Sequence, residues 1–416
     1  MTALDSIGRA WALVTGAEAL RLALGFIVSF VLARALGPAT YGTYAVLAAM
    51  VSIVGVLAEF GLSEAAVLRL SNSDGEARAF FWLRIALASV VIAVLCLLAA
   101  PLAKMLGIPD DGTLTRWALL GIVATACSGA VSVLLQANGA FGRMSTLTLF
   151  NTGLTAVLAV LLALTGQLTI TSALVVLGIG TSLATFALGL RLLRQNLSAP
   201  PLATLRHETR QLLKTGRWLW LAALLAMLAV NLDVLIVSRF LALEAVGAYA
   251  LAANLASKAS IVNHSLYTVL LPGVAGLGDQ RAIRAYLKQS LKRSAVVALG
   301  LAVAIPLAQP FVLLVYGEQF ALAVPLLQLL LGVVIFDVLA MPMLLLPLAY
   351  GRARLMAGAD GARAATLLAA GTALVPLYGP VGAVIARFAS RLAGAVLLLA
   401  MLQVQHKEPT SVAQSG

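Results

Sequence analysis

Charged side chains are scarce in this chain of 416 residues. Only 11% of its residues are Asp, Glu, Lys or Arg, whereas a soluble globular protein carries about 25%. Hydrophobic residues make up 62% of the chain. This shortage of charge excludes an ordinary soluble domain. The excess of basic over acidic residues, 28 to 16, therefore needs an explanation other than nucleic-acid binding.

The chain also has little cysteine, and it lacks the P-loop motif for nucleotide binding. The only two cysteines, Cys96 and Cys127, lie inside apolar segments, where we interpret them as small packing residues rather than disulfide partners or metal ligands. The P-loop pattern G-x-x-x-x-G-K-[ST] does not occur, which argues against ATP hydrolysis by this chain. We expect no ATP, no nucleic acid, no metal and no resident cofactor, with H⁺ or Na⁺ as candidate coupling ions.

Apolar runs of about 20 residues recur from end to end, and each is long enough to cross a hydrocarbon core of ~30 Å. They do not alternate between apolar and polar residues as the strands of a membrane β-barrel do. We predict an all-α integral membrane protein with about twelve transmembrane helices. The expected spans are residues 11–33, 44–68, 83–106, 114–137, 145–165, 170–193, 217–240, 246–272, 294–316, 322–349, 355–376 and 380–403.

Lys and Arg are distributed unequally among the loops that these spans define. The two termini and the even-numbered loops hold 19 of them, whereas the odd-numbered loops hold 4. The positive-inside rule therefore predicts that both termini are cytoplasmic. Two of the inner segments, 205–218 and 279–293, are basic and amphipathic. We expect them to lie on the inner leaflet. The alternative is that they bind a lipid head group directly.

A stretch of the first half reappears in the second half, shifted by 205 residues. Arg34, Leu36, Gly42 and Tyr44 recur as Arg239, Leu241, Gly247 and Tyr249. Both halves are predicted to begin inside, so we expect a six-plus-six parallel repeat. The predicted organisation is an N-terminal six-helix bundle at 1–195, a cytoplasmic amphipathic linker at 196–216, a C-terminal six-helix bundle at 217–404 and a cytoplasmic tail at 405–416.

Several of these patterns are similar to a known family. The run Arg34–Pro38, followed by Tyr41–Tyr44 and Glu59–Leu62, resembles the opening of polysaccharide (O-antigen/oligosaccharide) flippases of the multidrug/oligosaccharidyl-lipid/polysaccharide exporter superfamily. Residues 247–252 and 374–386 resemble its seventh-to-eighth and eleventh-to-twelfth span regions.

The resemblance implies two six-helix bundles arranged as a V around a central cavity in the bacterial cytoplasmic (inner) membrane. It also implies that polyprenyl-diphosphate-linked oligosaccharide is flipped from the inner to the outer leaflet by alternating access. The product would feed O-antigen, capsule or exopolysaccharide synthesis. The implied partners are the lipid-linked oligosaccharide, membrane lipids and other polysaccharide assembly proteins.

Ionisable side chains near the centres of the predicted spans are the candidate functional residues. A charge at the bilayer centre costs ~3 kcal/mol or more, so most of these groups must face one another or water. They therefore indicate a polar interior. The candidates are Glu18, Arg21, Glu59, Asp233, Lys258, His264, Asp337, Arg387 and Arg391.

The basic members of this set suggest an anion site. We hypothesise that Arg21, Lys258, Arg387 and Arg391 form a cationic cavity for a diphosphate, because the guanidinium fork matches phosphate oxygens. Arg387 and Arg391 share one helix face through their i, i+4 spacing. The alternative is that acidic neighbours neutralise these cations and only hold helices together. Glu18, three residues before Arg21, is such a neighbour.

The remaining candidates suggest ion coupling. Carboxyl groups in a low-dielectric interior, such as Glu18, Glu59, Asp233 and Asp337, can carry a proton. Asp233 and Asn231 could instead offer oxygens to Na⁺, and His264 could titrate near neutral pH. The structural alternative is that each group is buried and hydrogen-bonded.

Two other functions compete with the flippase hypothesis. The first is an ion-coupled exporter of drugs or other small molecules. If it exported cations, its interior should be biased to carboxylates, whereas the central acidic and basic groups here are balanced. A membrane-embedded polysaccharide polymerase or ligase should carry catalytic residues on long outer loops, and the predicted outer loops are short. We therefore predict a transporter that is not an enzyme.

Overall fold

The computed structural model describes residues 3–69, 74–193, 197–199, 201–274, 280–346 and 354–405. Within these ranges it describes the backbone alone for residues 3–15, 401–405 and some others, among them His264. Every regular element within these ranges is a helix, which confirms the predicted all-α class. The chain divides into two compact units, Met1–Met227 and Leu228–Gly416. The first is called unit 1 and the second unit 2.

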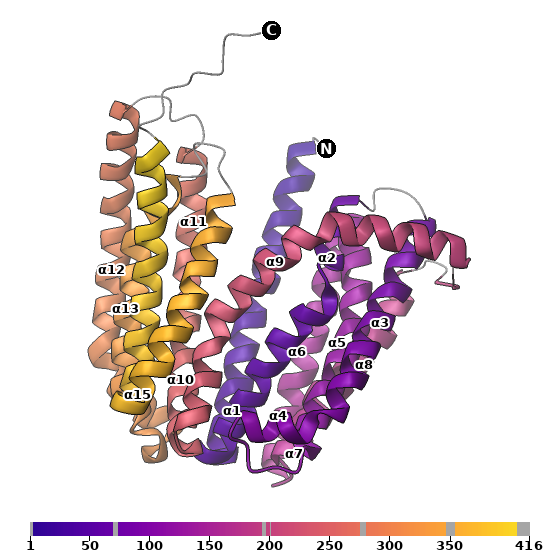
Figure 1. The fold of residues 1–416 in the computed structure, drawn as a ribbon, viewed down its shortest axis with the longest axis horizontal. Helices are drawn as coiled ribbons and strands as arrows, with labels where there is room; N and C mark the ends of the chain where they lie inside the picture. Colours follow the sequence, from indigo (N-terminus) through magenta and orange to yellow (C-terminus); the bar gives the residue numbers. More distant parts are fainter. Residues whose placement is uncertain are drawn as a thin grey trace. The chain divides into compact units, whose positions relative to one another are not determined.

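Unit 1 contains nine helical elements and the first part of a tenth (Figure 1). They are α1 (Ala3–Glu59), α2 (Leu62–Arg69), α3 (Asp74–Leu97), α4 (Ala99–Met105), α5 (Thr113–Ala137), α6 (Phe141–Leu164), α7 (Ile170–Ser172), the π-helix η1 (Ala173–Gly180), α8 (Thr181–Leu193) and the start of α9 (Leu202–Phe240).

Unit 2 contains the end of α9 and the remaining helices. They are α10 (Leu243–Ala259), α11 (Ile261–Val274), α12 (Gln280–Tyr316), the 3₁₀-helix η2 (Glu318–Phe320), α13 (Ala323–Leu344) and α15 (Arg354–Gln405).

Ten helices in the described ranges are long and apolar enough to cross a membrane, and two of them exceed 40 residues. Both long helices are interrupted at a Gly-Pro pair. Gly37 in α1 has φ 72° and Gly379 in α15 has φ 60°, a conformation that favours glycine. The following Pro38 and Pro380 begin a new helix, where a missing N–H costs nothing. With these breaks counted, the described chain holds twelve apolar segments, the number predicted.

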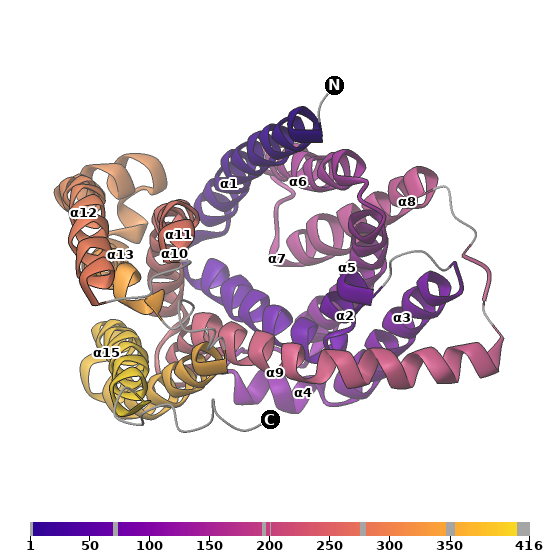
Figure 2. The same cartoon turned by 90° about the horizontal axis from the view of Figure 1, so that it is seen from above.

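Helix α5 is central to unit 1. It packs against α1, α2, α3, α6 and α8, and Figure 2 shows α3 and α8 beside it. The core of this unit includes the fully buried Phe80 of α3, Leu134 of α5 and Leu147 of α6. Such residues face protein, whereas other large apolar side chains on the same helices are exposed, as expected where a helix faces lipid.

The first part of α9 is docked on the bend between α1 and α2. Phe60 (φ 49°) and Gly61 (φ 69°) form this left-handed bend. Trp220 of α9 stacks on Phe60 with the ring centroids 5.7 Å apart, and its indole N–H donates to the carbonyl of Val56 at 3.1 Å. Leu212 is buried in the unit 1 core. Leu205 and Leu213 pack against the same core, so an apolar face of segment 205–218 contacts protein. Its position on the inner leaflet stays a prediction.

We expect Gly216→Ala to destabilise unit 1. A Cβ at Gly216 would stand 2.6 Å from the backbone oxygen of Gly61, and the backbone cannot yield as a flexible side chain can. Overpacking of this kind typically costs about 1–3 kcal/mol. The check is the thermal unfolding midpoint of the purified protein in detergent. Gly153→Ala is the matched control, because nothing lies within 4 Å of its Cβ position. An equal midpoint for both variants would contradict the close approach.

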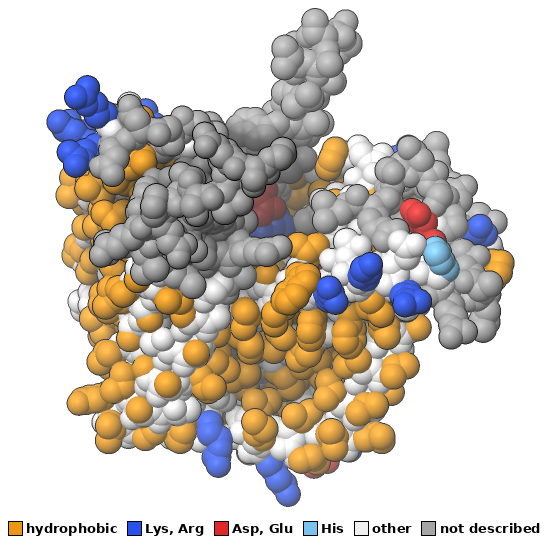
Figure 3. All heavy atoms as spheres, turned by 45° about the horizontal axis from the view of Figure 1, so that its top comes forward, with side chains coloured by type: hydrophobic (Ala, Val, Ile, Leu, Met, Phe, Trp, Pro, Cys, Tyr) orange, Lys and Arg blue, Asp and Glu red, His pale blue; other side chains and the backbone are white. Residues whose placement is uncertain are grey.

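Helix α13 is central to unit 2 and packs against α10, α11, α12 and α15. Its Val338, and Leu345 directly after the helix, are buried in a core shared with Leu270 of α11 and Ala298 of α12. Helix α12 runs without a break from the basic segment into the ninth predicted span. On the face drawn in Figure 3, apolar side chains cover the sides of the helices and Lys and Arg gather toward their ends, as expected for a protein that spans a membrane.

Candidate functional site

A helix break introduces polar groups into the interior of unit 2. Helices α10 and α11 meet at Ser260, whose N–H bonds to the carbonyl of Ala256 at 2.9 Å. The Asn263 N–H in turn bonds to the carbonyl of Ser260 at 2.9 Å. The break falls in the eighth predicted span. Interrupted transmembrane helices are a recurrent way to build binding sites at membrane depth, so the surroundings of Ser260 are a candidate site.

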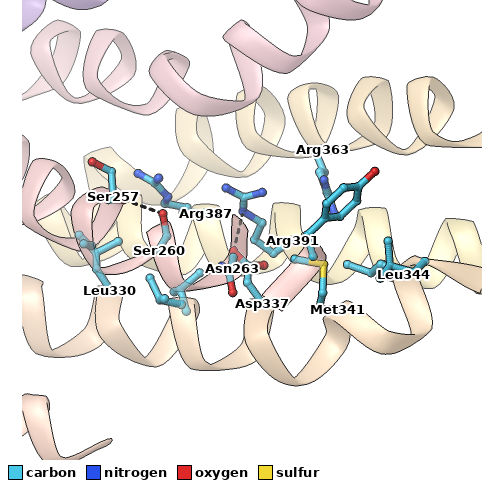
Figure 4. A pocket seen from close by; sticks show the side chains of 15 residues that line it. Ser257, Ser260, Asn263, Leu330, Asp337, Met341, Leu344, Arg363, Arg387 and Arg391 are labelled. Carbon is cyan, nitrogen blue, oxygen red and sulfur yellow. Dashed lines mark hydrogen bonds and ion pairs between the residues drawn. The ribbon is translucent and has the colours of Figure 1, made fainter. Parts of the chain in front are cut away.

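A cavity of about 420 Å³ adjoins this break, and its lining comes from α10, α11, α13 and α15 together with Ser260 and Leu345 (Figure 4). One part of the lining is polar and carries three arginines on α15, whereas the α13 side is mostly apolar. The polar lining residues are Ser257, Ser260, Asn263, Tyr267, Asp337, Arg363, Arg387 and Arg391. The apolar ones are Ala256, Leu330, Val333, Val334, Met341, Leu344 and Leu345.

Arg387 is held firmly by Asp233, a carboxylate that is itself fixed by a third helix. Its Nη1 lies 2.7 Å from Oδ2 of Asp233 on α9, and the Tyr249 hydroxyl of α10 donates to the same oxygen at 2.6 Å. Asp233 is only 2% exposed. The backbone N–H of Val234 is 2.8 Å from the other carboxylate oxygen. The geometry therefore favours the structural interpretation of Asp233 over a coupling role.

Asn231 and Asp233 both lie on α9, two residues apart, and residues at i, i+2 of a helix point to different sides. The oxygens of Asp233 are engaged by Arg387, Tyr249 and Val234. A Na⁺ site shared by Asn231 and Asp233 stays a prediction.

Arg391 is held more loosely than Arg387. Its Nε is 3.5 Å from Oδ2 of Asp337 on α13, and the two side chains are 21% and 17% exposed. In Figure 4 both side chains reach into the cavity near Asn263. A contact of 3.5 Å is at the limit of a hydrogen bond. Arg391 thus offers a guanidinium whose counter-ion is farther away than that of Arg387 and lacks a close hydrogen bond to it.

Arg363 is a third cation of the cavity, and it is not among the candidate residues predicted from the sequence. Its Nη1 pairs with Asp360 at 2.9 Å, and its buried Nε has no hydrogen-bond partner within the described chain. The signal was available. A hairpin turning at Gly379 brings together residues about equally far from the turn, so Arg363 meets Gly394 and lies on the same wall as Arg391.

The other predicted cations do not line the cavity. Arg21 belongs to unit 1, where its Nε lies 2.9 Å from Glu18, three residues away on α1. This confirms the pairing that the spacing predicts. Lys258 is a half-buried residue of α10 next to Ser257, and it is not among the lining residues. The side chain of His264 lies outside the described residues.

Glu59, which is itself half-buried, forms an ion pair with a buried arginine in unit 1. It contacts the guanidinium of Arg84 on α3, and both Glu59 and Arg84 bond to the hydroxyl of Ser63. Gly129 of α5 leaves room for this guanidinium, since a Cβ there would stand 2.7 Å from its Nη2. Arg84 falls in the predicted third span, residues 83–106, and the structure places it within α3, which begins at Asp74.

We expect Glu59→Gln to keep the dependence of transport on ion gradients, counted per folded molecule. The carboxylate is committed to Arg84 and Ser63, so it is poorly placed to load and release a coupling ion. The measurement is uptake by proteoliposomes under imposed Na⁺ or pH gradients. A variant that folds but no longer responds to either gradient would restore Glu59 as a coupling group.

The sequence of the chain matches a protein-family model described as "Polysaccharide biosynthesis protein" over residues 31–325. That match covers well over half of the chain. The chain belongs to this family. The match covers α5 and the Glu59–Arg84 pair of unit 1, and in unit 2 it covers the α10–α11 break.

Two curated relatives agree with this assignment. The chain is 27% identical to the succinoglycan biosynthesis transport protein ExoT of Rhizobium meliloti over 322 residues. The aligned region covers 74% of this chain and 62% of ExoT. It is 26% identical to the lipopolysaccharide biosynthesis protein WzxC of Escherichia coli over 336 residues, which is 78% of this chain and 65% of WzxC. The matched region thus spans somewhat less than two thirds of either relative.

The fold is that of a solved flippase. The lipid II flippase MurJ in an inward closed conformation superposes on this chain with a TM-score of 0.73. The superposition covers 94% of this chain and 87% of MurJ. The two sequences are only 16% identical, so the likeness concerns the fold and not the residues of the site. The resemblance expected from the Arg34–Pro38 and Glu59–Leu62 patterns is confirmed at the level of family and fold.

Proposed function

We propose that this protein flips polyprenyl-diphosphate-linked oligosaccharide from the inner to the outer leaflet of the bacterial cytoplasmic membrane by alternating access, for O-antigen, capsule or exopolysaccharide synthesis. The observation that carries the proposal is the unit 2 cavity, where three arginines of α15 face a lining that is otherwise half apolar. The family supports it, as do relatives named for succinoglycan transport and lipopolysaccharide biosynthesis.

The cavity suits the diphosphate part of such a substrate. Guanidinium groups bind phosphate oxygens through parallel N–H donors, and these charge-assisted bonds are about twice as strong as neutral ones. Ser257, Ser260 and Asn263 add neutral hydrogen-bonding groups, while Leu330 and Met341 offer an apolar wall. A volume of about 420 Å³ is typical of a site for a small ligand. It therefore accommodates a head group rather than a whole lipid-linked oligosaccharide.

The driving force need not come from ATP. Moving a negative charge outward across an inside-negative membrane gains about 2.3 kcal/mol per charge per 100 mV. H⁺ or Na⁺ coupling is optional on this argument. Among the predicted coupling carboxylates of the described chain, Asp337 is the one that lines the cavity, so it is the residue through which we expect any coupling to act.

The proposal is tested by reconstitution. Proteoliposomes are loaded with a fluorescent polyprenyl-diphosphate sugar in both leaflets, and an external reagent destroys the outer-leaflet label. We expect the wild-type protein to expose the inner-leaflet pool, and a neutral glycolipid of equal chain length to stay protected. Failure to expose the diphosphate lipid, together with uptake of a cationic dye, would favour the small-molecule exporter instead.

A further inference from the structure

The three arginines of the unit 2 cavity differ in how firmly their counter-ions are held. Arg387 meets Asp233 at 2.7 Å, and that carboxylate also accepts from Tyr249. Arg363 meets Asp360 at 2.9 Å, one helical turn away on α15. Only Arg391 has its described counter-ion, Asp337, at 3.5 Å on a different helix, α13. Two of the three cations therefore have close partners outside the cavity lining, and the third has a distant partner inside it.

The placement of Asp337 distinguishes it from the other two carboxylates. Asp337 lines the cavity, whereas Asp233 and Asp360 do not. Figure 4 shows its side chain beside those of Asn263 and Arg391, with the long ion pair between them. Three arginines act on this carboxylate electrostatically: Arg391, Arg363 and Arg387. Asp337 thus stands where an incoming anion would have to bind.

We propose that Asp337 is an exchangeable counter-ion, which occupies Arg391 in the empty cavity and is displaced by a phosphate group of the substrate. This inference rests on the proposed function. An unpaired guanidinium inside a membrane protein is costly, so the empty cavity needs an internal anion. A phosphate offers more acceptor oxygens and more charge than one carboxylate held at 3.5 Å. It therefore replaces that carboxylate at Arg391.

Displacement has two consequences for transport. Asp337 competes with the substrate, which weakens binding and helps the diphosphate to leave on the outer side. It also raises selectivity, because a neutral or weakly charged head group cannot replace the carboxylate and is rejected. Arg363 and Arg387 line the same cavity, so the displaced carboxylate remains in a positive field.

The test measures binding of inorganic pyrophosphate and of geranylgeranyl diphosphate to the purified full-length protein in detergent, by titration calorimetry. We expect Asp337→Asn to lower the Kd of both probes about 10-fold. Asp337→Glu should keep the Kd near that of the wild type, because the competing charge is retained. Asp360→Asn is the matched control, because its partner Arg363 lines the cavity but Asp360 itself does not. It should change the Kd less than Asp337→Asn.

The outcomes separate this inference from the proposed function. If the wild type binds both probes and Asp337→Asn binds them equally or more weakly, the counter-ion role is wrong while the diphosphate site stands. If neither the wild type nor Asp337→Asn binds either probe, both proposals fall. Binding by Asp337→Asn alone would show that the carboxylate blocks the site, which supports the exchange. Thermal unfolding of each variant confirms that a folded protein was titrated.

Discussion

Arg391→Ala is expected to lower flipping of the lipid-linked oligosaccharide roughly 10- to 100-fold. Arg391 lines the cavity, and Asp337 engages its guanidinium only at 3.5 Å. A charge-assisted hydrogen bond contributes about 1.5–3 kcal/mol, and a tenfold change corresponds to about 1.4 kcal/mol. The measurement is the initial rate in the proteoliposome assay, normalised to the amount of protein inserted.

Two further variants make this result interpretable. Arg391→Lys keeps the positive charge but loses the planar pair of guanidinium donors, so we expect a flipping rate between those of the wild type and Arg391→Ala. Arg116→Ala removes a positive charge from an exposed residue of α5 that lies in unit 1, and it should flip like the wild type. If Arg391→Ala also flips at the wild-type rate, Arg391 does not bind substrate and the site has to be sought elsewhere.

Asp233→Ala is expected to prevent accumulation of folded protein. The substitution leaves Arg387 without its close counter-ion in the interior of unit 2. Removing one partner of a buried ion pair typically costs about 3–5 kcal/mol, and net stabilities are only about 5–15 kcal/mol. We therefore expect low yield and a strongly reduced unfolding midpoint in detergent.

A double variant distinguishes the effect of the unpaired arginine from a general loss of stability. Asp233→Leu combined with Arg387→Met removes both charges, and we expect it to recover most of the lost stability because replacing a buried pair by apolar residues is often neutral. Tyr249→Phe is the matched control for the hydrogen bond alone, with an expected cost of about 1 kcal/mol. A single Asp233→Ala variant as stable as the wild type would contradict the buried pair.

Much of the fold follows from local patterns in the sequence. Apolar runs of about 20 residues that do not alternate with polar residues cross a bilayer as helices, because every backbone N–H and C=O group must be hydrogen-bonded within the protein. The pairs Gly37-Pro38 and Gly379-Pro380 mark the two tight turns, since a positive φ suits glycine and proline begins the next helix. The i, i+4 spacing of Arg387 and Arg391 correctly predicted that they share a face.

The partners of these charges could not be predicted in the same way. Asp233 and Arg387 are separated by 154 positions in the sequence, and a carboxylate on an apolar helix fits an ion site as well as an arginine pair. Only the packing of α9, α10 and α15 selects the second. The Glu59–Arg84 pair could not be predicted for the same reason, because its members are 25 positions apart in the sequence and only the packing brings Glu59 and Gly129 beside the guanidinium.

The most direct test of the account follows the lipid-linked sugar in cells. A deletion strain is complemented with the wild type or with Arg391→Ala, and the polyprenyl-diphosphate-linked oligosaccharide is quantified separately in each leaflet of the cytoplasmic membrane. We predict that the intermediate accumulates in the inner leaflet and that only the wild type clears it. If no lipid-linked sugar accumulates in either leaflet of the deletion strain, the flippase assignment is wrong.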